Sequence, residues 1–168
     1  MTRPLAPGDA MLHPLALASL ALLIFNDHVL KIRAPGVVSG KLSDVAILVV
    51  GPLLLQGVVE VAAARGGRAW RPSSRVLLAT CVLTGAAFAL EKSLASATRL
   101  YSLTWGALRW PLDTAIARIA GHPSPAFAPV AAVTDPTDLA TLPALWLAWR
   151  VHRARGAGRS AGRSFALW

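Results

Sequence analysis

Four segments of the chain are apolar over lengths comparable to the thickness of a lipid bilayer, and this pattern constrains the fold most. They cover about residues 11–32, 42–64, 75–92 and 137–151. An α-helix rises about 1.5 Å per residue, so about 20 apolar residues cross the hydrocarbon core. Only 15% of the residues are charged and 55% are hydrophobic, whereas about a quarter are charged in soluble domains. The sequence therefore predicts an all-α, four-span transmembrane helical bundle.

The remaining segments fit a single membrane domain, predicted at residues 1–152. Residues 99–120 have apolar side chains at helical spacing, but Arg109 and Asp113 share the opposite face. Such a helix is typical of the membrane interface, so we predict an extracytoplasmic interfacial helix here and not a fifth span. Residues 153–168 are rich in Gly, Ser and Arg, and this composition predicts a disordered basic tail.

The basic residues predict the orientation of the spans, because short loops rich in Lys and Arg stay in the cytoplasm. Arginines follow the second and the fourth predicted span: Arg65, Arg68, Arg71, Arg75, Arg150, Arg153, Arg155, Arg159 and Arg163. An even number of spans then places the N-terminal segment, with Arg3, on the same side. We predict a multi-pass protein of the inner cell membrane with both termini in the cytoplasm.

Charge and motifs exclude several function classes. The formal net charge of +9 suggests nucleic acid as a partner, but the basic residues flank apolar segments and form no stripe with aromatic residues. We therefore expect no nucleic-acid partner. The single cysteine, Cys81, cannot form an intrachain disulfide, and no glycine-rich phosphate loop or nucleophile elbow occurs. Membrane lipids are the expected partners, and a protein partner or a second copy of the chain is left open.

Polar residues gather at the predicted outer ends of the spans. NDHVLK (26–31) ends the first span, SGKLSD (39–44) begins the second, Glu91-Lys92 ends the third and Asp135–Asp138 begins the fourth. Ionisable groups this close to a membrane core usually face the bundle interior and pair with one another. Only three of the 17 basic residues are lysines, and all three lie in this outer layer. The candidate functional residues are Asp27, His28, Lys31, Lys41, Asp44 and Glu91.

One interpretation of this layer is structural. Asp135 followed by Pro136 has the form of a helix start, and Ser39 or Asp44 could cap the second span. Asp27 and Lys31 have the spacing of an ion pair within one helix. At the inner end of the second span, Glu60 is predicted to pair with an arginine of the loop that follows. The protein would then be a non-enzymatic membrane component that binds lipids or a partner.

The alternative is an intramembrane metal-dependent hydrolase or transferase that acts on lipid headgroups. His28, with Asp27, Asp44 or Glu91, could bind a divalent metal ion, which would lower the pKa of bound water. Lys31, Lys41 and Lys92 would hold a phosphate. The sequence requires no cofactor, and the metal belongs to this alternative alone, with His28 and Asp44 as candidate ligands. A proton pathway would need polar groups at mid-depth, where few occur. Whether the protein is an enzyme is left open.

Three of these elements resemble an uncharacterised family of bacterial polytopic membrane proteins. NDHVLK…PGVVSGKLSD before an apolar helix, and the later DPTDLATLPALWLAW, are similar to the family's NDHxxK, GKLSD and DPxDL elements. The resemblance covers residues 1–55 and 130–149, while the middle of the chain is only loosely similar. Ala46-Ile47 stand where a pair of small residues is expected. The resemblance implies a membrane location and names no activity.

Overall fold

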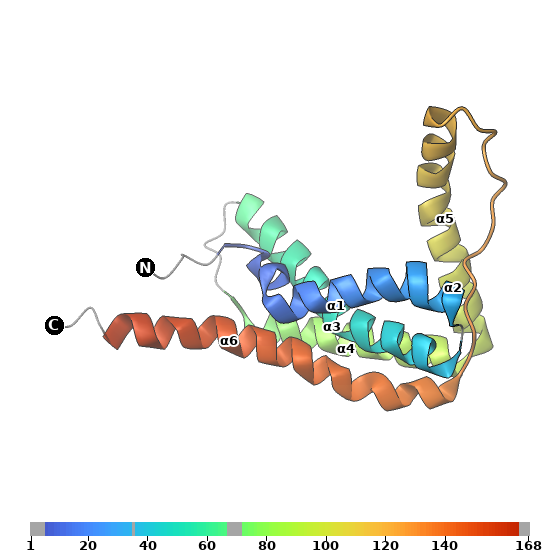
Figure 1. Cartoon of the computed structure of the whole chain (residues 1–168). Coiled ribbons are helices and arrows are strands. Elements are labelled where there is room, and N and C mark those ends of the chain that lie inside the picture. Colours follow the sequence, from blue (N-terminus) through green and yellow to red (C-terminus); the bar gives the residue numbers. More distant parts are fainter. Residues whose placement is uncertain (1–5, 35, 67–71, 165–168) are drawn as a thin grey trace. The chain divides into compact units, whose positions relative to one another are not determined.

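All elements of the computed structural model are helical over the residues that it describes, 6–34, 36–66 and 72–164 (Figure 1). They are η1 (Asp9–Leu12), α1 (Pro14–Phe25), η2 (Asn26–Leu30), α2 (Lys31–Arg33), α3 (Val37–Arg65), α4 (Ser74–Ser93), α5 (Ala95–Ile119), η3 (Pro136–Ala144) and α6 (Leu145–Ser164). The predicted all-α class is confirmed.

Three helical stretches in the described part of the chain are long and apolar enough to cross a membrane. They are Pro14–Arg33, Val37–Arg65 and Ser74–Ser93, and they match the first three predicted spans. The predicted fourth span, 137–151, is not among them, because it is divided between the 3-10 helix η3 and the arginine-rich α6. All but the last residue of the predicted interfacial segment, 99–120, lies in α5, which confirms a helix there but not its place at a membrane interface.

The chain divides into two compact units. The first consists of Met1–Ala86 and Ala140–Trp168, and the second of Ala87–Leu139. Both units are described separately below. The predicted single membrane domain thus contains two clusters of internal contacts, with the division falling inside α4 and η3.

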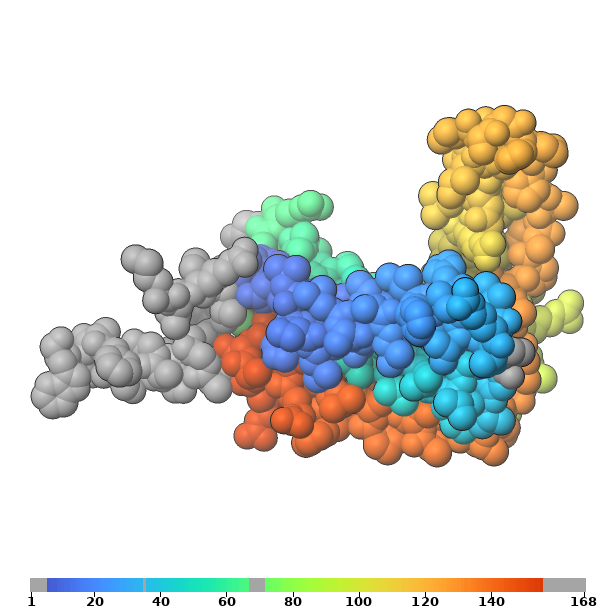
Figure 2. Space-filling view, viewed as in Figure 1, coloured from blue at the N-terminus to red at the C-terminus, as the bar shows by residue number. Residues whose placement is uncertain are grey.

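The helices of the first unit alternate in direction. Gly8, just before α1, contacts the late α3 residue Glu60, whereas Asn26, just after α1, contacts Ser39 near the start of α3. α6 packs on α3, and in Figure 2 α1 and the segment before it lie directly against α6. We call the two ends of this unit the Glu60 end, which also holds Ser74 and Arg155, and the Asn26 end, which also holds Ser43.

A small apolar core joins these helices. Its buried members come from η1, α1, α3, α4 and α6: Ala10, Ala16, Val49, Leu53, Leu77, Ala148 and Val151. Small residues permit the close approach of helices, as is common in membrane bundles. A Cβ atom at Gly51 of α3 would lie 3.2 Å from Thr84 of α4, and one at Gly85 would lie 3.0 Å from Leu145 of α6.

Local sequence explains where the helices of the first unit begin. Pro14 occupies the first turn of α1, where its missing N–H costs nothing, and the His13 side chain accepts a hydrogen bond from the Leu15 N–H. At the start of α3, Ser39 Oγ accepts from the Gly36 N–H at 3.1 Å. The predicted capping role of Ser39 is therefore confirmed, whereas Asp44 lies in the third turn, too far along α3 to cap it.

The second unit is built on α5 and the extended chain after it. The indole N–H of Trp110 donates to the Pro125 carbonyl at 2.9 Å. A Cβ atom at Gly106 would lie 2.7 Å from the Ala128 carbonyl oxygen, so glycine is required for this approach. Residues 121–135 therefore run back along α5, the outer face of which carries exposed apolar side chains.

The C-terminal prediction and the structure differ. Disorder was predicted from residue 153, but α6 continues to Ser164. The buried ion pairs of Arg155 hold the middle of this helix against the rest of the unit, two residues beyond the predicted start of the tail. Of the remaining sequence-based predictions, those for Arg3, Arg68, Arg71 and 165–168 fall outside the described residues, as do the side chains of Arg159 and Arg163.

Candidate functional site

The carboxylate of Glu60 lies at the centre of a buried polar cluster at the Glu60 end. Only 4% of the residue is exposed. Its Oε2 accepts from the Gly8 N–H at 2.9 Å, and its Oε1 accepts from Gln56 Nε2 at 2.8 Å. The left-handed conformation of Gly8, with φ of 80°, presents its N–H to the helix. Buried carboxylates are stable only with such donors.

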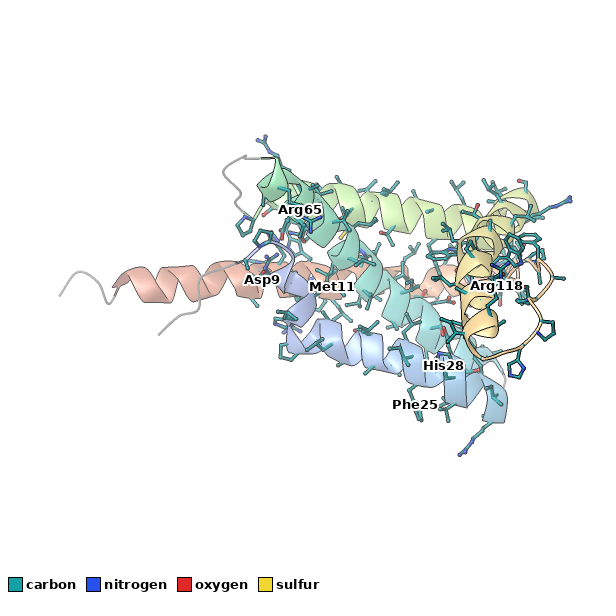
Figure 3. The ribbon with its side chains drawn as sticks, turned by 90° about the horizontal axis from the view of Figure 1, so that it is seen from above. Asp9, Met11, Phe25, His28, Arg65 and Arg118 are labelled. Carbon is teal, nitrogen blue, oxygen red and sulfur yellow. The ribbon has the colours of Figure 1, made fainter. Side chains whose placement is uncertain are left out.

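Arg155 supplies the balancing charge. Its Nη1 and Nη2 atoms lie 3.4 Å from the Oε1 and Oε2 atoms of Glu60, respectively, and Nη2 also donates to Asp9 Oδ1. Asp9 lies before α1, Glu60 is in α3 and Arg155 is in α6, so one guanidinium joins three parts of the chain. Figure 3 shows Asp9 and Met11 at the end of α1 opposite to Phe25 and His28. This triad is a candidate structural lock.

His152 extends the cluster to α4. Its Nε2 lies 3.0 Å from Ser74 Oγ, and its Nδ1 lies 3.4 Å from Gln56 Nε2. The Glu60 carboxylate can only accept hydrogen bonds, so the NH₂ group of Gln56, and not its carbonyl oxygen, faces Glu60. The same NH₂ group faces His152. His152 Nδ1 must then be the acceptor and His152 Nε2 must carry the proton. In this tautomer the imidazole donates to Ser74.

That tautomer decides what the serine–histidine pair can do. A serine nucleophile needs an imidazole nitrogen that accepts its proton. Here the nitrogen that faces Ser74 already carries a proton, and the Gln56 amide, not a carboxylate, faces the other nitrogen. The pair is therefore arranged as a hydrogen-bonded contact between α4 and α6 and not as a nucleophile and its base.

Burial lowers the pKa of His152 below the 6.5 of a solvated histidine, and the charge of Arg155 lowers it further while Glu60 opposes this. The neutral imidazole is thus favoured in the folded state. The contribution of His152 to the free energy of unfolding is fully present above pH 6.5 and falls as the pH drops below that value. The reason is that the imidazole binds a proton more tightly in the unfolded chain than in the folded one.

We expect the thermal unfolding midpoint of detergent-purified protein to be lower at pH 5.5 than at pH 8. His152→Gln keeps a donor toward Ser74 but does not titrate, so its midpoint should change less over the same range. Differential scanning fluorimetry of both proteins measures this. An equal pH dependence in the two proteins would show that His152 is not its source.

A second buried cluster lies at the Asn26 end. Asn26 is fully buried, and its Nδ2 donates to the Ser39 carbonyl and to Ser43 Oγ, both at 2.6 Å. Ser43 Oγ donates in turn to Asp27 Oδ1 at 2.7 Å. Asn26 begins the π-helix η2, in which the Lys31 N–H donates to the Asn26 carbonyl. π-helical turns are rare and often mark functional positions.

The structure distributes the predicted candidates between the two units. In the first, Asp27 and Lys31 form the predicted ion pair at 2.8 Å with both side chains partly exposed. His28 is exposed, Lys41 is half-buried and Asp44 is buried. In Figure 3 His28 lies at the end of α1, close to Phe25. These five candidates thus lie near the Asn26 cluster in sequence, and Asp27 belongs to it, but Asn26 is its buried centre.

Glu91, the sixth candidate, belongs to the second unit. There Lys92 Nζ lies 3.0 Å from Asp138 Oδ2 and 3.9 Å from Glu91 Oε2. Asp135 Oδ1 accepts from the Thr137 N–H at 2.9 Å, as expected of a residue at the start of η3. The predicted capping role of Asp135 is confirmed, and the short helix it caps is a 3-10 helix.

Two sequence-based expectations change with the geometry. The partner of Glu60 is Arg155 of α6, which replaces the predicted loop arginine. Across the described residues, no three His, Cys, Asp or Glu side chains are grouped so that they could hold a metal ion. The metal-dependent alternative built on His28 and Asp44 therefore has no three-ligand group in that part of the chain.

The Glu60 cluster is the part of the site that sequence reasoning did not assemble. A signal was present, because Gln56 and Glu60 are four residues apart within an apolar helix and so share one face. His152 and Arg155 have the matching three-residue spacing in α6. What the sequence did not indicate was which helix faces these pairs.

Comparison with known proteins finds no matching protein family, no matching curated sequence and no matching solved structure.

Proposed function

We propose that the chain is an integral protein of the inner cell membrane, in which buried polar clusters hold the helices together and whose role is structural or the binding of lipids or a partner. One observation carries the membrane assignment. In the first unit the polar residues Asn26, Ser43, Gln56 and Glu60 are buried, whereas large apolar side chains are exposed: Leu17, Ile24, Phe25, Leu54, Val58, Leu78, Val82 and Leu83.

This distribution is the reverse of that in a soluble domain. An apolar surface of this extent is unfavourable in water but suits lipid. Polar side chains inside a membrane bundle usually face other helices and pair there. Helical stretches of 20, 29 and 20 residues are long enough to cross the hydrocarbon core. The segment 137–151, with its buried Ala148 and Val151, is proposed as the fourth span.

The arginines support an orientation for this bundle. Arg65, Arg75, Arg150 and Arg153 belong to the Glu60 end and are exposed. By the positive-inside rule this end faces the cytoplasm, and the Asn26 end faces outward. Both termini are then cytoplasmic. α5, with exposed apolar residues on its surface, is proposed to lie in the outer interface.

The hydrogen bonds of the Glu60 carboxylate and of the Asn26 amide nitrogen favour the non-catalytic function, while Asn26 Oδ1 and Gln56 Oε1 have no hydrogen-bond partner among the described residues. Glu60 accepts from three residues, and Asn26 bridges to α3 through two hydrogen bonds. Groups held by protein partners are suited to fixing helix register. A metal-dependent hydrolase or transferase is the competing hypothesis. It requires stoichiometric metal that is lost in both His28→Ala and Asp44→Asn, which elemental analysis of purified protein would measure.

The membrane proposal is tested by labelling single cysteines. Cys81→Ala removes the sole cysteine, and Val37→Cys or Arg153→Cys then adds one exposed thiol at either end of the first unit. A membrane-impermeant maleimide should label the Val37→Cys chain in spheroplasts and the Arg153→Cys chain only in inverted vesicles. The Cys81→Ala chain is the unlabelled control.

Extraction of membranes with alkaline carbonate complements the labelling, and each outcome tests one part of the proposal. Release of the wild-type chain from membranes by alkaline carbonate would overturn membrane integration. Labelling of both thiols from the same side would contradict the proposed span arrangement. Labelling from opposite sides in the reverse sense would leave an integral protein with its Glu60 end outside.

A further inference from the structure

Four exposed arginines occupy the Glu60 end of the first unit: Arg65 at the end of α3, Arg75 at the start of α4, and Arg150 and Arg153 in α6. Contacts between the helices place all four at this end of the unit, at different depths: Arg65 lies beyond the Glu60–Arg155 contact and Arg150 lies before it. Arg75 follows Ser74, which contacts His152, the residue before Arg153. Arg65 lies five residues after Glu60, or about 7.5 Å further along the helix, and Glu60 contacts Arg155 of α6. We call these four residues the arginine collar.

The carboxylates at the Glu60 end already form ion pairs with a buried arginine. Asp9 and Glu60 both pair with the buried Arg155. No residue of the arginine collar forms an ion pair with a carboxylate in the part of the chain that the structure describes. The arginine collar therefore retains its positive charge at the surface, beside a buried cluster that carries more acid than base.

The surroundings of the arginine collar fit a membrane surface better than water alone. On α6, Trp146, Arg150 and Arg153 share an exposed face at spacings of four and three residues. The Arg150 guanidinium lies over the Trp146 ring at 5.0 Å. Tryptophan is enriched at the level of lipid headgroups. Arg150 lies near the inner end of the proposed fourth span, and from there its long side chain can extend to headgroup phosphates.

We propose that the arginine collar binds the phosphates of anionic phospholipids in the cytoplasmic leaflet. This inference rests on the proposed membrane insertion and names the lipid class. A planar guanidinium forms two parallel hydrogen bonds to phosphate, and basic residues near an anionic leaflet each strengthen binding. The neutral headgroup of phosphatidylcholine offers the same phosphate with an attached cation, so it binds more weakly.

The test is native mass spectrometry of the detergent-purified full chain. The protein is offered phosphatidylglycerol and phosphatidylcholine with identical acyl chains in equal amounts. Wild type should retain phosphatidylglycerol preferentially. Replacing all four collar arginines with glutamine should reduce this preference by about tenfold or more. Four exposed arginines outside the collar, Arg33, Arg99, Arg109 and Arg118, provide a matched quadruple glutamine control that should retain the preference.

Two further variants keep the test decisive. Replacing the four collar arginines with lysine keeps the charge and should retain most of the preference. Arg150→Gln/Arg153→Gln alters only α6 and serves if the quadruple variant does not fold, as judged by gel filtration. Inorganic phosphate is added as a competitor and should not displace the lipid.

Equal losses in the collar and control variants would overturn the proposal, because net charge alone would then explain the preference. Displacement of the lipid by inorganic phosphate would overturn the choice of lipid over a free anion. The proposed membrane insertion is judged separately by carbonate resistance of the same variants. A carbonate-resistant wild type with no preference for phosphatidylglycerol therefore contradicts this inference alone.

Discussion

Arg155→Ala is expected to lower the free energy of unfolding by about 3–5 kcal/mol, the largest effect of any single substitution considered. The substitution removes the only guanidinium that contacts Glu60 and Asp9 among the described residues. The Glu60 carboxylate is 4% exposed, so water cannot replace the lost partner without opening the bundle. Denaturant titration of the protein in mild detergent, followed by circular dichroism, measures the change.

Arg153→Ala is the matched control for this prediction. It removes the same side chain two residues earlier in α6, where the guanidinium is exposed, and should change the free energy of unfolding by less than about 0.5 kcal/mol. Adding Glu60→Gln to Arg155→Ala should restore part of the loss, because the buried charge is then absent. If Arg155→Ala and Arg153→Ala are equally stable, the triad does not lock the fold.

Asn26→Ala is expected to lower the free energy of unfolding by about 2 kcal/mol. The substitution removes two hydrogen bonds of 2.6 Å to α3 and empties a fully buried position. Both effects loosen the contact between η2 and α3. Steric trapping or denaturant unfolding in detergent gives the change in stability.

A double-mutant cycle separates the hydrogen bond from the lost volume. Asn26→Ala and Ser43→Ala together should cost less than the sum of the two single changes, by about 1 kcal/mol. Lys31→Ala removes the partly exposed Asp27–Lys31 ion pair and should cost no more than about 1 kcal/mol. Strict additivity of Asn26→Ala and Ser43→Ala would mean that the two side chains do not interact energetically.

Much of the fold follows from local sequence. The apolar segments predicted at 11–32, 42–64 and 75–92 correspond to helical stretches at Pro14–Arg33, Val37–Arg65 and Ser74–Ser93. Length and hydropathy suffice for this, because a helix in lipid satisfies its own backbone groups. The fourth segment could not be assigned as safely, because Pro143 and the arginines of α6 interrupt its apolar pattern.

The candidate site was predicted less completely. Asp27–Lys31 and Asp135 were recognisable because their partners lie within four residues along the chain. Asn26, next to predicted candidates, gave no sign of being the buried centre, since its partners are 13 and 17 residues away, beyond a turn. The π-helical turn that begins at Asn26 has no simple sequence signature either.

The sequence by itself determined the helices, their apolar surfaces and the accumulation of arginine near certain helix ends. These properties depend on residues close to one another in the chain. Only the tertiary structure decided that Glu60 pairs with Arg155, 95 residues away, and that Arg155 also reaches Asp9, 146 residues away. The physical reason is that several arginines matched Glu60 equally well in charge, and the packing of α6 on α3 selected one of them.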